Sequence, residues 1–69
     1  MMNEDTFNMQ LRKFLKKVGI TSQREVEQAV RDALESGALR GDESLQASVV
    51  LKVPRIGLEV TITDAISLE

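Results

Sequence analysis

The spacing of apolar residues changes once along this 69-residue chain, and that change constrains the fold more than any other feature. Up to Leu34 apolar side chains recur every three or four positions, which is the period of one face of an α-helix. From Leu45 onward they recur at every second position, which is the period of a β-strand with one apolar face. The sequence therefore predicts a helical first part and a β-hairpin after Gly41.

A first helix is predicted over residues 4–18. Its apolar face consists of Phe7, Leu11, Phe14, Leu15 and Val18. Asn3 is the predicted N-cap, and Glu4 and Asp5 follow in the first turn, where carboxylates favour the positive end of the helix dipole. Gly19 is predicted to end this helix in the left-handed conformation.

A second helix is predicted over residues 23–36. The motif Ser22-Gln-Arg-Glu25 has the spacing of a capping box at its start, and Gly37 is predicted to end it. Its narrower apolar face consists of Val26, Ala29, Val30, Ala33 and Leu34. Glu27 and Arg31 are spaced and ordered as a favourable i,i+4 ion pair.

Two antiparallel strands are predicted over residues 44–53 and 58–63, joined by a turn at Pro54-Arg-Ile-Gly57. One face is apolar: Leu45, Ala47, Val49, Leu51, Val53, Leu58, Val60 and Ile62. The other face carries Gln46, Ser48, Val50, Lys52, Glu59, Thr61 and Thr63. Asp64 breaks the alternation, so we expect a bulge or turn there. The tail 65–68 is then either a short third strand or an extension of the second.

The element order predicts an α+β fold of the two-layer α-α-β-β type, with residues 1–69 in a single small domain. An isolated hairpin is marginal in water, so both helices are expected to pack on the apolar face of the small antiparallel sheet. A domain of this size without disulfides or metal has only about 3–5 kcal/mol of stability to spare. Self-association would add to that margin.

The composition excludes most catalytic chemistry. The chain has no histidine, cysteine, tryptophan or tyrosine, which removes His-based triads, thiol nucleophiles, and zinc, haem or iron–sulfur sites. Asp42 and Glu43 are too few ligands for a divalent cation, and Ser22 has no base beside it. We therefore expect no catalytic residue, no cofactor, no metal and no enzymatic activity.

The candidate functional residues are four cations, Arg12, Lys13, Lys16 and Lys17. They could form a patch for nucleic acid, phosphate or an acidic protein surface. The alternative, which we favour, is that cations near a helix C-terminus interact with its dipole and form an ordinary solvated face. Residues 1–20 carry a net charge of +2, whereas the whole chain carries −2, so nucleic acid is not favoured by the overall charge.

The stretch from Val18 to Val26 resembles a helix-turn-helix followed by a wing. The resemblance is imperfect, because Gly19 and Val26 are one residue too far apart. The supposed recognition helix also carries more acidic than basic residues and would repel phosphates. Duplex binding is therefore a minor alternative, and the strands offer no aromatic platform for single strands.

No apolar run is long enough to span a bilayer, and Glu4 and Asp5 do not fit a basic signal-peptide start. A cytoplasmic protein without a membrane partner is expected, which the lack of cysteine also suits.

The whole chain resembles a family of short uncharacterised bacterial proteins, a domain of unknown function. The stretches that carry the resemblance are Met2-Asn-Glu-Asp-Thr-Phe-Asn-Met9, Arg12-Lys-Phe-Leu15, Val18-Gly-Ile-Thr-Ser-Gln-Arg-Glu25 and Ser36-Gly-Ala-Leu-Arg-Gly41. The resemblance implies a bacterial, soluble, free-standing domain and no particular mechanism.

The function expected from the sequence is a non-enzymatic protein–protein interaction or structural domain. Its partner is either an unknown protein or a second copy, paired through an edge strand of the sheet. The alternative is a weak nucleic-acid or anion-binding module that uses the four cations of the first helix.

Overall fold

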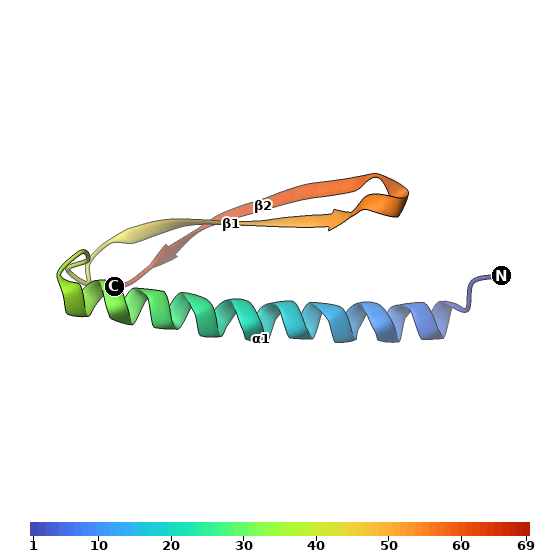
Figure 1. Ribbon diagram of the computed structural model, residues 1–69, viewed down its shortest axis with the longest axis horizontal. Helices are drawn as coiled ribbons and strands as arrows, with labels where there is room; N and C mark the ends of the chain where they lie inside the picture. Colours follow the sequence, from blue (N-terminus) through green and yellow to red (C-terminus); the bar gives the residue numbers. More distant parts are fainter. The chain divides into compact units, whose positions relative to one another are not determined.

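A computed structural model describes all 69 residues of the chain. The element order is α1 (Glu4–Ser36), β1 (Ser44–Val53), the 3-10 turn η1 (Pro54–Ile56) and β2 (Leu58–Ser67) (Figure 1). The chain divides into two compact units, Met1–Ser36 and Gly37–Glu69. The first holds the helix and the second holds the hairpin, so the protein has an α+β fold.

The predicted signals at the two ends of the helical region are confirmed. The Thr6 N–H donates to Asn3 Oδ1 at 3.0 Å, which is the expected N-cap contact. After Ser36 the backbone leaves the helix through Gly37, whose φ of +85° lies in the left-handed region that a side chain disfavours. The predicted i,i+4 ion pair joins Glu27 Oε2 and Arg31 Nη1 at 3.8 Å.

The prediction of two helices, over residues 4–18 and 23–36, is wrong: α1 is one uninterrupted helix of 33 residues. Gly19 is helical and does not take a positive φ. Glycine in a helix interior costs about 1 kcal/mol relative to alanine. A break would instead leave four N–H groups and four C=O groups without helical partners at the two new ends. With no proline between Val18 and Glu25, continuing the helix satisfies more backbone hydrogen bonds than the predicted capping box.

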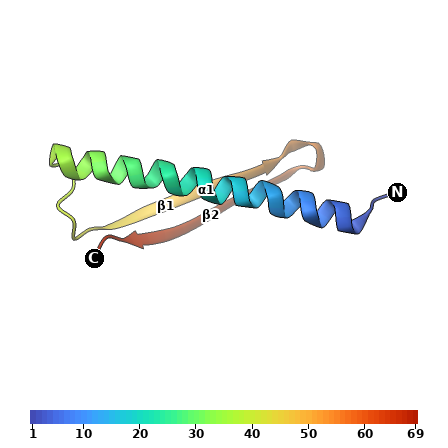
Figure 2. The same ribbon diagram turned by 90° about the horizontal axis from the view of Figure 1, so that it is seen from below.

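The hairpin has the predicted first strand and turn. β1 and β2 lie side by side and antiparallel, and the chain reverses through η1 and Gly57, whose φ is +68° (Figures 1 and 2). The register pairs Val53 with Leu58 next to the turn and Ser44 with Ser67 at the open end. Because alternate residues share a face, the register separates an apolar face from a polar one, as the alternation predicts.

The predicted bulge at Thr63-Asp64 is also wrong. The register continues without a shift, Asp64 pairs with Ala47, and β2 runs on to Ser67 instead of ending at residue 63. The tail is therefore an extension of the second strand, and the sheet has two strands. A uniform register keeps the ladder of backbone hydrogen bonds intact, and Asp64 remains exposed, so its charge stays hydrated.

No side chain of the chain is buried, and the large apolar residues of both units are mostly exposed. Each unit by itself therefore presents an apolar face and has no apolar core of its own. Packing of the helical region on the sheet, within a single domain, stays a prediction.

Candidate functional site

Most apolar residues of α1, together with Ser22, form a stripe along one side, here called the apolar stripe; Met9, Ile20 and Leu34 lie outside it. It contains Phe7, Leu11, Phe14, Leu15, Val18, Ser22, Val26, Ala29, Val30 and Ala33. At about 100° of rotation per residue these positions share one side of the helix along its length. Val18, Ser22 and Val26 carry the stripe past Gly19 in steps of four. Phe7 and Phe14 are 50% and 49% exposed, so the stripe can meet another surface.

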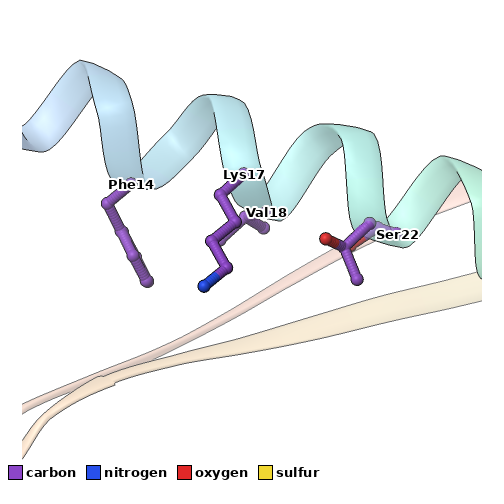
Figure 3. A pocket seen from close by; sticks show the side chains of 5 residues that line it. Phe14, Lys17, Val18 and Ser22 are labelled. Atoms are coloured by element: carbon purple, nitrogen blue, oxygen red, sulfur yellow. The ribbon is translucent and has the colours of Figure 1, made fainter.

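A shallow hollow lies on the apolar stripe near the middle of α1. It is lined by Phe14, Lys17, Val18, Thr21 and Ser22. Figure 3 shows these side chains along the same stretch of the helix, with Phe14, Lys17, Val18 and Ser22 labelled. The first four of the lining residues have the spacing i, i+3, i+4 and i+7, which is the arrangement that accepts a side chain from a facing helix.

A second hollow has the same spacing but different chemistry. It is lined by Ile20, Gln23, Arg24 and Glu27, three of which are polar or charged. These residues lie on the side of α1 away from the apolar stripe, at about 100° per residue. The first hollow is therefore the better receptor for an apolar side chain.

The four candidate cations lie on neighbouring turns in the first half of α1. All four are exposed, and none of them forms an ion pair in the structure. Lys13 and Lys16 lie on the polar side of the helix, whereas Arg12 has the same orientation around the axis as Val30 and lies at one margin of the stripe, at about 100° per residue. Lys17 lies at the margin of the apolar stripe, where it lines the first hollow. The structure thus places all four on one stretch of helix but gives Lys17 a different neighbourhood.

The apolar face of the hairpin is built from facing pairs. Leu45 pairs with Ile66, Val49 with Ile62, Leu51 with Val60, and Val53 with Leu58. Ile62 is 58% exposed. The pair Ala47 and Asp64 interrupts this face with one carboxylate, whose Oδ1 accepts a hydrogen bond from the Ala65 N–H at 2.8 Å. The face is otherwise a continuous apolar surface.

The polar face of the hairpin carries one ion pair. Lys52 Nζ lies 3.7 Å from Glu59 Oε1, next to the turn. Both side chains are well exposed, so this pair contributes little to stability.

The connection between α1 and β1 is organised by Glu43. Its carboxylate accepts the Arg40 N–H at 2.9 Å and the Gly41 N–H at 2.9 Å. The Arg40 hydrogen bond, followed by the Gly41 bond, lowers the pKa of the Glu43 carboxyl below its ordinary value of 4.5. At the same place the Leu68 N–H donates to the Glu43 C=O at 2.9 Å, which ties the chain after β2 to the start of β1. Glu43 therefore has a structural role at the open end of the hairpin.

Sequence reasoning missed the central part of the apolar stripe, including Thr21 and the first hollow. The available signal was the four-residue spacing of Val18, Ser22 and Val26, which carries the helical period through the supposed turn. The capping-box interpretation of Ser22 concealed it.

The structure holds no group of three or more His, Cys, Asp or Glu side chains placed to bind a metal ion. None of its helices combines the length and apolarity needed to cross a membrane.

Comparison with known proteins identifies the family. A family model described as a family of unknown function (DUF6494) matches residues 2–69, and the chain belongs to this family. No curated protein and no solved structure matches the chain.

Proposed function

We propose that this member of the DUF6494 family is a non-enzymatic protein–protein interaction domain whose apolar surfaces are covered by another polypeptide. The observation that carries the proposal is that each of the two units, taken by itself, presents an apolar surface. Exposed apolar patches of this kind mark interaction sites in soluble proteins. A cytoplasmic setting is part of the proposal, supported by the lack of cysteine.

The lengths of the two units show how much cover one chain can supply. At 1.5 Å per residue the 33 residues of α1 extend about 50 Å, and the apolar stripe from Phe7 to Ala33 extends about 39 Å. At about 3.3 Å per residue the ten-residue strands extend about 33 Å. A hairpin laid along the stripe would leave about 6 Å of its length uncovered. Length alone therefore does not require a partner.

The hairpin offers a second means of association. In a two-stranded sheet β1 and β2 each have one edge without a strand partner. Such edges present unpaired N–H and C=O groups that can pair with another strand. A second copy or a partner peptide added at one edge would widen the sheet and extend its apolar face.

The proposal is tested by following helical content, thermal stability and molecular mass as the concentration of the purified chain is varied. Association predicts that mass and melting temperature rise together with concentration, because cover for the apolar surfaces then comes from other copies. A chain that is unfolded alone and folds only with a different protein would also support the proposal. A fully folded monomer whose melting temperature is independent of concentration would overturn it.

A second candidate function is anion or nucleic-acid binding by Arg12, Lys13, Lys16 and Lys17. The observation that favours it is that four exposed cations without ion-pair partners occupy neighbouring turns of one helix. Such a patch would bind phosphates mainly by electrostatic attraction and would lose affinity steeply with salt.

This alternative is tested by titrating labelled protein with a random duplex and with a single strand at low salt. Amide shifts centred on residues 12–17 that vanish at moderate salt would support it. No response to either nucleic acid would leave protein contact as the better proposal.

A further inference from the structure

The two halves of the apolar stripe differ in the size of their side chains. The first half carries the large residues Phe7, Leu11, Phe14 and Leu15. The second half carries the smaller residues Val26, Ala29, Val30 and Ala33, with the large Leu34 to one side of them. A surface that packs evenly against this stripe must carry small side chains opposite the large ones of the first half and large side chains opposite the small ones of the second half.

The two halves of α1 also differ in charge. Residues 1–20 carry a net charge of +2, and residues 21–36 carry −2. A partner that complements this helix is therefore acidic beside the first half and basic beside the second. A second α1 that runs in the opposite direction meets both requirements. It places small side chains and net negative charge beside the first half, and large side chains and net positive charge beside the second half.

We propose that α1 pairs antiparallel with the α1 of a second copy, across a two-fold axis close to Ser22. This inference rests on the proposed function and names its partner. In that arrangement Leu11 faces the partner's Ala33 and Leu15 faces the partner's Ala29. A parallel pair would set large residues against large ones at one end and the four cations against their own copies. The antiparallel pair avoids both conflicts, and it gives the closed two-fold symmetry that most dimers have.

The central positions of the stripe fix the register of this pair. At about 100° per residue Leu11, Leu15, Ser22, Ala29 and Ala33 lie within about 40° of one another around the helix axis. With the two-fold axis at Ser22, Leu11 lies opposite the partner's Ala33 and Leu15 lies opposite the partner's Ala29, so a large side chain meets a small one at each place. By symmetry each contact is made twice.

The charges beside the seam support the same register. Lys17 and Glu25 lie on the same flank of the stripe, and Lys17 lies about 80° farther from its centre, at about 100° per residue. In antiparallel pairing like flanks meet, so along the axis Lys17 of each copy lies within one helical turn of the partner's Glu25. Neither residue has an ion-pair partner in the single chain. Two such contacts per dimer specify the direction and register of the pair, and they contribute less to its affinity.

The apolar face of the hairpin is the main competitor for the stripe. It offers only one charge, that of Asp64, among its facing apolar pairs. The hairpin therefore complements neither the size gradient nor the charge gradient of α1, whereas a second α1 complements both.

Single-cysteine variants test the direction of pairing, because the chain has no native cysteine. Under mild oxidation Ser22→Cys is expected to form a disulfide-linked dimer, since residue 22 of each copy lies beside the axis. Leu11→Cys mixed with Ala33→Cys is expected to form the mixed dimer, whereas Leu11→Cys alone is not. Its two sulfurs would lie about 33 Å apart.

A charge swap tests the register independently. Lys17→Glu alone and Glu25→Lys alone are each expected to weaken dimerisation about three- to ten-fold, because each sets like charges beside one another at two places. The double variant Lys17→Glu/Glu25→Lys is expected to restore the dissociation constant to that of the native chain. Helical content of each variant, measured at the same concentration of dimer, separates weaker pairing from failed folding.

The outcomes separate this inference from the proposed function. Efficient cross-linking of Leu11→Cys with itself, without the mixed dimer, would overturn the antiparallel arrangement while association remained. Association without any of these cross-links, and without an effect of the charge variants, would assign the contact to the sheet edge and overturn this inference alone. A folded, concentration-independent monomer would overturn both.

Discussion

The backbone hydrogen bonds of the helix and of the hairpin join residues at different separations in the sequence. Each hydrogen bond within α1 joins residues four apart, whereas the hairpin pairs residues as distant as Ser44 and Ser67. Both units have one apolar side, and neither has a buried side chain. Both units therefore need another surface against their apolar sides, but they differ in the backbone hydrogen bonds that hold each of them together without it.

The comparison indicates which unit depends more on a partner. A helix of 33 residues exceeds the roughly 12–15 residues below which isolated helices are marginal. A two-stranded hairpin is marginal in water at any ordinary length. We therefore expect substitutions in α1 to act mainly through local backbone effects. Substitutions on the hairpin face should act through the loss of apolar cover.

The largest expected effect is that of Thr21→Pro, which tests whether α1 is continuous. In an uninterrupted helix, proline at this position removes a hydrogen bond and clashes with the preceding turn, at a cost of about 3 kcal/mol. The control is Glu4→Pro, at the first helical position, where proline is tolerated. Circular dichroism and urea unfolding measure both variants. Equal tolerance of the two prolines would restore the two-helix interpretation.

The next effect is that of Ile62→Asp, which tests whether the apolar face of the hairpin is covered in the folded protein. Loss of a covered isoleucine costs about 1.5–3 kcal/mol, and an unpaired charge adds to that cost. Thr61→Asp, on the opposite face, is the matched control and should change the free energy of unfolding by less than about 0.5 kcal/mol. If the two variants unfold at the same urea concentration, this face is open to solvent.

A smaller effect of opposite sign is expected at two glycines. Gly19→Ala should stabilise the helix by about 0.5–1 kcal/mol, because alanine is the better helix former and no atom lies within 4 Å of the added Cβ. Gly37→Ala should destabilise the chain by about 1 kcal/mol, since its φ of +85° disfavours any side chain. Thermal unfolding at fixed protein concentration measures both. Destabilisation by Gly19→Ala would indicate a turn at that position.

The smallest effect concerns the pH dependence of the connection at Glu43. Because hydrogen bonds to the folded carboxylate lower its pKa, its stabilising contribution is present above the ordinary value of 4.5. That contribution is lost as the pH falls through the lower folded pKa. The amide resonances of Arg40 and Gly41 should titrate with a midpoint below 4.5, and Glu43→Gln should abolish the titration. A midpoint at or above 4.5 would show that the hydrogen bonds do not persist in solution.

Sequence reasoning reproduced the elements that depend on local chemistry. The cap at Asn3, the end of the helix at Gly37 and the turn at Gly57 follow from residues that act within a few positions. The split at Gly19 failed because the same residues suit both a turn and the middle of a helix, and local signals do not weigh the cost of the two new helix ends. The candidate cations were correctly placed on a helix but wrongly near its C-terminus, because α1 continues to Ser36 and its last turn has no basic residue. The hollow beside Lys17 was hidden by the same split.

By itself the sequence determined the α+β class, the start and end of the helical region, and which residues of β1 share a face, because periodicity and caps are local properties of the chain. Only the three-dimensional structure decided that the helical period continues through residues 19–22 and that β2 extends past Asp64 to Ser67. The reason in both cases is the continuity of backbone hydrogen bonding. An unbroken helix and an unshifted ladder keep more groups paired than a break would, and an exposed glycine or aspartate costs too little to prevent it.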